Sequence, residues 1–265
     1  MTTMNSSKTG ATRMEKTLRG KVALIAGGGR GIGAATAKLL ADRGALVFVD
    51  YLKNEVAARR VVAEIHAKGQ LAVMVQADAR EPEHVKTMVE SILEDNEHID
   101  IMIDSASSFA FVKPFAEITW DEFIWGVSSE LQAAFELTKA VLPAMQKQHY
   151  GRLVYVGSGL AKAPIMEGAI SIGTAKAGLV AFARYIAKEY GPYGITANVV
   201  SPAMVETELS SQIPGEQKQR VASMAPLGRI AQPEDIARAI AFFASDDSAF
   251  VTGTNMPVNG GMNME

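Results

Sequence analysis

Short apolar runs alternate with longer amphipathic segments along most of the chain. The runs rich in Val, Ile and Ala are typical of strands buried on both faces of a sheet, and they lie at 21–26, 45–49, 71–76, 99–103, 151–156, 196–200 and 251–258. Segments with apolar residues at helical spacing lie at 32–41, 55–68, 85–94, 123–148, 174–190 and 233–244. This alternation predicts an α/β fold, with a doubly wound parallel sheet of the Rossmann type between two layers of helices.

The pattern also predicts the domain organisation. No linker, internal repeat or change of composition divides the chain, so we expect a single domain over residues 19–265. Residues 1–18 are polar and of mixed charge, and we expect them to form a disordered leader. They lack the apolar stretch of a secretory signal, and no apolar run reaches the 18 or more residues that a membrane span needs.

Composition narrows the classes of partner. Of 265 residues, 26 are Lys or Arg and 29 are Asp or Glu, so the net charge of −3 provides no strong field for nucleic acid or an anionic membrane. Cysteine is absent, which excludes thiolate zinc sites and a Cys nucleophile and fits a reducing, cytoplasmic location. The four histidines are not spaced with acidic residues as metal ligands, so no metal site is predicted.

A glycine cluster follows the first predicted strand and precedes the first predicted helix. Its spacing is Gly27-x3-Gly31-x-Gly33. Glycines let the backbone approach a pyrophosphate, and a helix N-terminus favours negative charge, so the cluster predicts a phosphate cradle. A glycine-rich turn without a ligand is the alternative. A P-loop is excluded because no Gly-Lys-Ser/Thr follows.

Several ordered motifs make the sequence resemble the short-chain dehydrogenase/reductase family. After the glycine cluster these motifs are Asp78 behind the third strand, Gly151 to Ser158, Ala175-Lys176-Ala-Gly, Asn198 to Pro202 with Thr207, Pro226 to Arg229, Pro233 to Asp235, and Val258 to Gly261. The resemblance covers nearly everything from Leu18 onward. Within the family the sequence looks most similar to 3-oxoacyl-carrier-protein reductases and related bacterial reductases.

The resemblance implies a nicotinamide cofactor and the residues that contact it. These are Gly27, Gly29, Arg30, Gly31, Ile32, Gly33, Asp50, Tyr51, Asp78, Ala79, Ser105, Ala106, Lys176, Pro202, Ala203, Val205 and Thr207. NADP(H) is favoured, because Asp50-Tyr51 resembles the Asn-Tyr of NADP-preferring members and Arg30 can bind a 2′-phosphate as a fork. NAD(H) remains possible, because the Asp50 carboxylate would repel that phosphate.

The catalytic residues implied by the resemblance are incomplete. Ser158 matches the Ser that polarises the carbonyl, and Lys176 matches the catalytic Lys. Four residues before Lys176, where the family has its proton-donating Tyr, stands Ile172, and Glu130 occupies the position of the family's Asn. A missing general acid costs about 10²–10⁴ in rate. Three residues are candidates to replace the donor: Glu130, Glu167 and Ser171.

Three functions are therefore compatible with the sequence. The first is a reductase of a ketone or 3-oxoacyl-like carbonyl, with a displaced acid. The second is a cofactor-binding pseudoenzyme that acts as a regulatory or structural partner, and the third is a non-redox dehydratase or cyclase of secondary metabolism. The segment 208–220 keeps the length of the family's substrate lid, which favours the reductase. The segments 109–115 and 208–220, which would line the substrate pocket, look apolar with few polar anchors and are compatible with an acyl chain or another mainly apolar ketone. The resemblance further implies a small substrate, free or carrier-bound, and a homotetramer built on the helices at 123–148 and 174–190.

Overall fold

Seven parallel strands form one sheet in a computed structural model that describes residues 17–106 and 111–264. The strands are β1 (Val22–Ala26), β2 (Leu46–Tyr51), β3 (Ala72–Gln76), β4 (Ile101–Asp104), β5 (Gly151–Val156), β6 (Ile195–Pro202) and β7 (Asn255–Val258). Their order across the sheet is β3-β2-β1-β4-β5-β6-β7. The chain reverses its direction of winding between β1 and β4, and ligands of such sheets bind in the crevice outside the carboxyl ends at that point.

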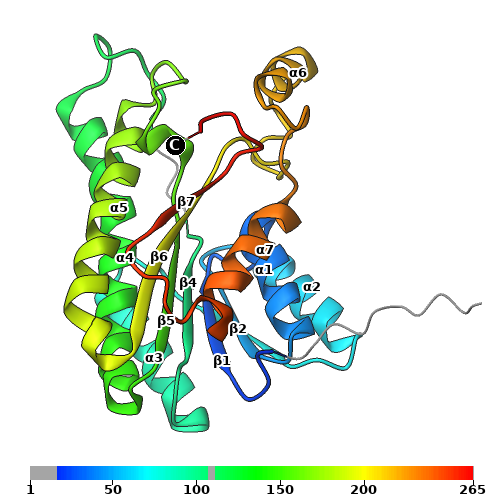
Figure 1. The fold of residues 1–265 in the computed structure, drawn as a ribbon, viewed down its shortest axis with the longest axis vertical. Helices are drawn as coiled ribbons and strands as arrows, with labels where there is room; N and C mark the ends of the chain where they lie inside the picture. The colour runs from blue at the N-terminus through cyan, green and yellow to red at the C-terminus, as the bar shows by residue number, and fades with distance from the viewer. Residues whose placement is uncertain (1–16, 107–110, 265) are drawn as a thin grey trace, which may run out of the picture.

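Helices cover both faces of the sheet (Figure 1). They are α1 (Gly31–Asp42), α2 (Glu55–His66), α3 (Pro82–Asn96), α4 (Trp120–Gln148), α5 (Ile170–Tyr190), α6 (Gly215–Met224) and α7 (Pro233–Phe243), with short 3₁₀ turns at Gly159–Ala161, Gly191–Tyr193 and Asp246–Ser248. One core cluster packs α3, α4 and α5 against the sheet, and a second packs α1, α2 and α7 against its other face. The predicted three-layer Rossmann-type fold is confirmed.

The residues of the core are those that the spacing of apolar side chains along the sequence predicts. All five residues of β1 are buried, as expected of a central parallel strand. On α7 the buried side chains include Ile236, Ile240 and Phe243, which are spaced by four and three residues and so share one face of the helix. The apolar stripe of each helix thus fixes which side faces the sheet.

Several boundaries differ from those expected, among them the start of α4 at Trp120 rather than at residue 123. Helix α3 begins at Pro82, since proline is well suited to the first helical position, and α5 begins at Ile170 rather than at residue 174. The last strand begins at Asn255 rather than at residue 251. Helix α6 was not predicted, because it has no buried residue and therefore no apolar period to detect.

Leu18, which we expected to lie in the leader, packs into the domain. Leu18 is only 1% exposed and joins the core cluster of α1, α2 and α7, and its amide N–H donates to the carbonyl of Arg43 at 2.9 Å. Leu18 therefore belongs to the domain. Residues 1–16 lie outside the described part of the chain.

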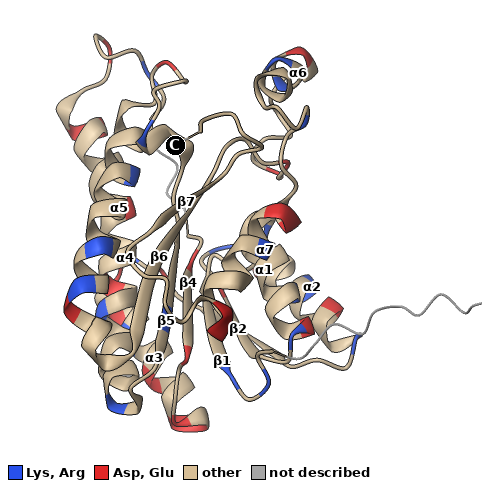
Figure 2. Cartoon of the chain, in the orientation of Figure 1, with Lys and Arg blue, Asp and Glu red and all other residues tan. Residues whose placement is uncertain are grey.

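Charged residues of both signs are interspersed over the helices in the view of Figure 2, in keeping with the small net charge. Within residues 17–106 and 111–264, no helix is long and apolar enough to cross a membrane.

Candidate active site

The glycine cluster forms a tight loop between β1 and α1. Gly27 and Gly31 have positive φ angles of 69° and 53°, a region that side chains rarely adopt. A Cβ at Gly33 would lie 2.2 Å from the carbonyl oxygen of Gly27, and one at Gly27 would lie 2.8 Å from that of Ser105. Only glycine fits this approach of backbone to backbone.

The loop leaves the N-terminus of α1 open. Arg30 is the N-cap residue, its side chain is exposed and makes no capping hydrogen bond, and the first turn holds no acidic residue. The first amide N–H groups of α1 have no acceptor within the helix, and the helix dipole favours an anion there. The cradle therefore fits the pyrophosphate of a dinucleotide.

Asp50, at the end of β2, supports the loop from inside. Its carboxylate accepts from the amide N–H of Gly27 at 3.3 Å and of Ala77 at 3.1 Å, and the residue is 3% exposed. Burial raises the pKa of Asp50 to about 7, opposed by those two hydrogen bonds. Its carboxylate is thus occupied within the protein, while the next residue, Tyr51, is half-buried.

Asp78 and its neighbours lie at the carboxyl end of β3. The Asp78 carboxylate accepts from the Arg80 guanidinium at 2.9 and 2.6 Å, and this hydrogen-bonded cation lowers the pKa of Asp78. Ala79 is buried, whereas Ser105 and Ala106, after β4, are half-buried. The adenine contact predicted for Asp78 stays a prediction, and its carboxylate already has a strong partner.

The segment that follows β6 reaches the glycine loop. Pro202 and Val205 are buried, and Ala203 is half-buried. The Thr207 methyl lies 3.3 Å from where a Cβ of Gly31 would stand. The fold therefore brings together two segments that are far apart in sequence and that were both predicted to bind the cofactor.

The catalytic positions lie near the carboxyl end of β5, on the segment that follows it and on the helices α4 and α5. Ser158 follows β5, and its hydroxyl accepts from the Leu160 amide N–H at 3.2 Å. The Lys176 ammonium donates to the Val156 carbonyl at 2.7 Å and to the carboxylate of Glu130. Ile172 lies one turn before Lys176 on α5, so the two side chains share a face of the helix. The structure thus brings all four predicted residues to one region.

Asp104 is an additional buried acid that was not among the predicted site residues. It ends β4 beside Tyr155 of β5, and its carboxylate accepts from the Ala106 amide N–H at 3.2 Å. Burial and then the negative charge of Glu130 raise the pKa of Asp104 to about 7, while Lys176 opposes this rise. The signal in the sequence was an aspartate directly after the apolar run Ile101–Ile103.

The other two candidate acids lie apart from this group. Ser171 is 0% exposed, and its hydroxyl donates to the carbonyl of Phe111 at 3.3 Å. Glu167 is exposed in the loop before α5. Of the three candidate donors, Glu130 is the one in contact with Lys176.

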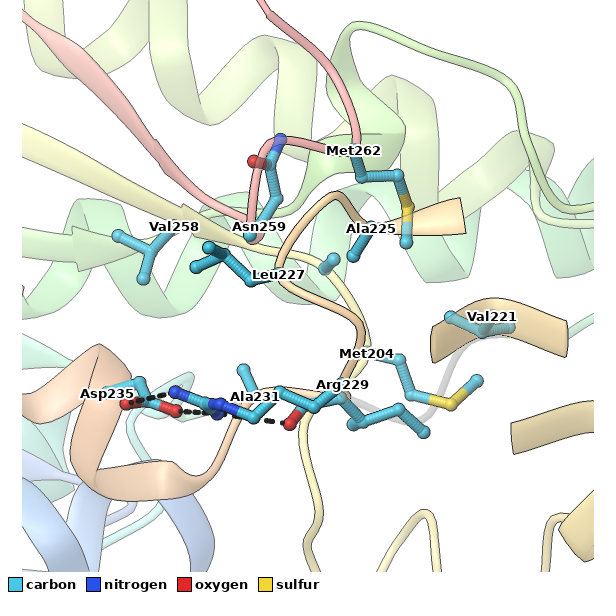
Figure 3. Close-up of a pocket in the computed structure, with 13 residues that line it drawn as sticks. Met204, Val221, Ala225, Leu227, Arg229, Ala231, Asp235, Val258, Asn259 and Met262 are labelled. Atoms are coloured by element: carbon cyan, nitrogen blue, oxygen red, sulfur yellow. Dashed lines mark hydrogen bonds and ion pairs between the residues drawn. The ribbon is translucent and has the colours of Figure 1, made fainter. Parts of the chain in front are cut away.

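An apolar cavity of about 230 Å³ opens behind the segment after β6 (Figure 3). Met204, Val221, Ala225 and Met262 line it, and the Arg229–Asp235 ion pair, with contacts of 2.5 and 3.0 Å, closes one side. It lies between α6, which overlaps the expected lid at 208–220, and the C-terminal segment. In the part of the chain that the structure describes, no group of three or more His, Cys, Asp or Glu could hold a metal ion.

The fold and the glycine loop define the class: a Rossmann-type α/β protein with a polar site at the carboxyl end of its sheet. Residues 26–263 match a family model described as enoyl-(acyl carrier protein) reductase. The chain belongs to the short-chain dehydrogenase/reductase family.

Individual relatives agree with this assignment. The chain is 34% identical to a 3-oxoacyl-acyl-carrier-protein reductase of Pseudomonas aeruginosa over 247 residues, covering 93% of this chain and 99% of the relative. It is 33% identical to the enzyme of that name in Escherichia coli, covering 92% and 98%. A solved dehydrogenase/reductase of Sinorhizobium meliloti superposes with a TM-score of 0.87 at 31% identity, covering 94% and 98%.

Proposed function

We propose that the protein is a carbonyl reductase that uses NADP(H) in preference to NAD(H) and acts on a ketone or a 3-oxoacyl-like compound, free or bound to a carrier. The observation that carries this proposal is the meeting of the glycine cradle, the segment 202–207, Ser158 and Lys176 at one end of the sheet. The names of its relatives, 3-oxoacyl-acyl-carrier-protein reductases, support the substrate class.

Each site residue then has a definite task. The amides of the glycine loop and α1 bind the pyrophosphate, and exposed Arg30 is available to a 2′-phosphate. The bound nicotinamide supplies the hydride. Ser158 donates a hydrogen bond to the carbonyl oxygen, and Lys176 holds positive charge beside it. Asp50 keeps the loop in shape, because both of its oxygens bind backbone amides.

The proton cannot come from residue 172, because an isoleucine side chain has none to give. Ser171 donates to a carbonyl and Glu167 is exposed, so neither is placed for this task. The ion pair of Lys176 and Glu130 is buried near the end of β5, the strand that precedes Ser158. We therefore assign the proton supply to this pair, with Lys176 as the group that faces the substrate.

Apolar side chains around the site favour an apolar substrate. Phe111, Val112 and Phe115, from the segment before α4, are at least 41% exposed, as are Leu209 of the expected lid and Met224 at the end of α6. Exposed apolar groups of this kind mark ligand or partner surfaces. An acyl chain would bury them. The same reasoning supports a homotetramer, because α4 and α5 also carry exposed aromatic residues on their outer sides.

One observation favours a second function, a cofactor-binding protein without turnover. Ile172 provides no acid, and among the contacts described for Lys176 its ammonium group is already paired with Glu130. Such a protein would bind the dinucleotide and leave a carbonyl unchanged. It would act as a regulatory or structural partner.

A two-stage experiment separates the two functions. The purified protein is titrated with NADPH and NADH, following nicotinamide fluorescence, and is then mixed with a 3-oxoacyl thioester while oxidation of the cofactor is followed. Micromolar binding with NADPH preferred, followed by turnover, supports the reductase. Binding without turnover supports the pseudoenzyme, and no binding up to millimolar concentration contradicts both.

A further inference from the structure

Three ionisable side chains are buried together at the carboxyl ends of β4 and β5. Asp104 of β4, Glu130 of α4 and Lys176 of α5 are 3%, 6% and 7% exposed. Lys176 contacts the Glu130 carboxylate directly and donates to the Val156 carbonyl at 2.7 Å. Asp104 stands opposite Tyr155 in the register of β4 and β5, one residue before Val156, and the charges of Glu130 and Lys176 both act on it. The set brings two carboxyl groups to one ammonium group.

When both acids are ionised, two negative charges face the single positive charge of Lys176, and the three side chains carry a net charge of about −1. Two carboxylates that share a buried site cannot both stay ionised at low cost, because water no longer screens their repulsion. Burial and the Glu130 charge raise the pKa of Asp104 to about 7, so a proton remains in the set near neutral pH. Asp50 of β2 adds to this rise, whereas Lys176 and the Ala106 amide oppose it.

The remaining titratable group at the site is Tyr155 of β5. Its hydroxyl shares a hydrogen bond of 2.7 Å with Thr138, and burial holds its pKa above the usual range, so it stays neutral. It therefore does not compensate the surplus charge.

The backbone does not require an acid at position 104. The hydrogen bond from the Ala106 amide needs only a carbonyl-type oxygen, which asparagine would supply equally well. What the carboxyl group adds is an exchangeable proton. That proton lies next to an active site whose usual donor position is occupied by Ile172.

We propose that Asp104 and Glu130 hold one proton between them and that this proton recharges Lys176 during reduction of the substrate, an inference that rests on the proposed reductase function. Asp104 is then a positioning residue that acts through Glu130. It does not touch the substrate.

The steps balance as follows. Hydride addition from the reduced nicotinamide to the carbonyl carbon forms a C–H bond and leaves an alkoxide, and the cofactor is oxidised. Lys176 gives one proton to the alkoxide oxygen, which becomes the alcohol, and takes one proton from the Asp104–Glu130 pair through Glu130. The pair is then fully ionised and regains its proton from solvent after product release.

The variant Asp104→Asn tests this supply while preserving shape and the Ala106 hydrogen bond. In the wild type, we expect kcat of reduction to fall as the pH rises from roughly 6 to roughly 8.5, because the shared proton is lost on the way. In D104N, we expect kcat at roughly pH 6 to be about tenfold lower and this decline to disappear. The KM for the carbonyl compound and the affinity for NADPH should be unchanged.

Infrared spectroscopy tests the shared proton without turnover. The wild type should show the C=O stretching band of a protonated carboxyl group at roughly pH 6, and this band should weaken at roughly pH 8.5 and be reduced in D104N. Asp100→Asn is the matched control, since Asp100 is 5% exposed and precedes the same strand at its other end. It should change neither the Asp104 band nor the pH profile of kcat.

The possible outcomes distinguish a failure of this inference from a failure of the proposed reductase function. An active wild type whose band is unchanged in D104N, or D104N with the pH profile of the wild type, would overturn the inference and leave the reductase standing. An inactive wild type would refute the reductase and the supply role with it, while a band reduced in D104N would still show that Asp104 is protonated near neutral pH.

Discussion

Residue 172 determines how the site can work. It lies in the first turn of α5, one turn before Lys176 and on the same face, where a tyrosine hydroxyl would stand next to the ammonium group. The isoleucine that is present keeps the apolar bulk and removes the acid. In the proposed reductase, the proton then comes from the buried groups behind Lys176.

Ile172→Tyr should therefore raise kcat for carbonyl reduction by about 10²-fold, because a general acid in place contributes about 10²–10⁴. Steady-state oxidation of NADPH with a 3-oxoacyl thioester measures this. Ile172→Phe is the control, since it adds the ring without the hydroxyl. If the tyrosine variant is no faster than the phenylalanine variant, the absent acid does not limit the rate.

Asp50 is a second single residue with a predicted effect, in this case on how the stability of the fold depends on pH. Its pKa is about 7 in the folded protein, against an ordinary value of 3.8 for an unfolded aspartate, so between these values the folded state binds more protons than the unfolded state. Its contribution to stability is therefore present below about pH 4 and is lost as the pH rises through about 7.

Asp50→Asn removes that dependence. As the pH rises from about 4 to about 8, the difference in free energy of unfolding between the variant and the wild type should shift in favour of the variant. A difference of about three between the folded and unfolded pKa values implies a change on the order of 2–4 kcal/mol. Urea unfolding at several pH values measures the difference. The exposed Asp95→Asn is the control and should give a flat difference, and a flat difference for D50N would show that its carboxyl titrates normally.

Among the elements, the loop from β1 to α1 has the least room for change. Gly33→Ala would place a methyl group 2.2 Å from the Gly27 carbonyl, so the loop must move away from the positions that bind a pyrophosphate. We expect NADPH affinity to fall at least tenfold and the free energy of unfolding to fall by about 1–3 kcal/mol.

Fluorescence titration and urea unfolding measure both effects. Gly191→Ala is the control, because nothing lies within 4 Å of its added Cβ and its φ is −51°. It should leave both quantities within about 0.5 kcal/mol. An alanine at position 33 that binds NADPH as well as the wild type does would contradict the role of the cradle.

For the whole molecule, the proposed tetramer depends on the outer sides of α4 and α5. Phe135 is 47% exposed and Tyr185 is 70% exposed, which is unfavourable unless a partner covers them. Light scattering should give four times the chain mass for the wild type, and Phe135→Glu combined with Tyr185→Glu should yield smaller species.

Val56→Glu is the control for this experiment, because Val56 is 80% exposed on α2 at the other face of the sheet. It should leave the mass unchanged. A wild type that runs as a monomer at micromolar concentration would contradict the tetramer directly.

The sequence by itself determined the layers of the fold and predicted most of the residues that the structure brings together at the candidate site. Strands such as β1 are wholly apolar and helices such as α7 carry one apolar stripe, so local periods suffice to identify them. The glycine spacing and the offset of four residues between Ile172 and Lys176 are likewise local. The helix α6 was not predicted, because none of its residues is buried and its sequence has no apolar period.

Only the tertiary structure decided how the polar groups are paired. Asp50 and Asp78 are both acids near strand ends in the sequence. The buried Asp50 carboxylate accepts hydrogen bonds from two backbone amides, whereas the Asp78 carboxylate accepts from the guanidinium of Arg80. Asp104, Glu130 and Lys176 come from three separate elements. Protonation and pairing depend on burial and on charges brought together across the sheet, and these are long-range quantities that no local pattern of residues encodes.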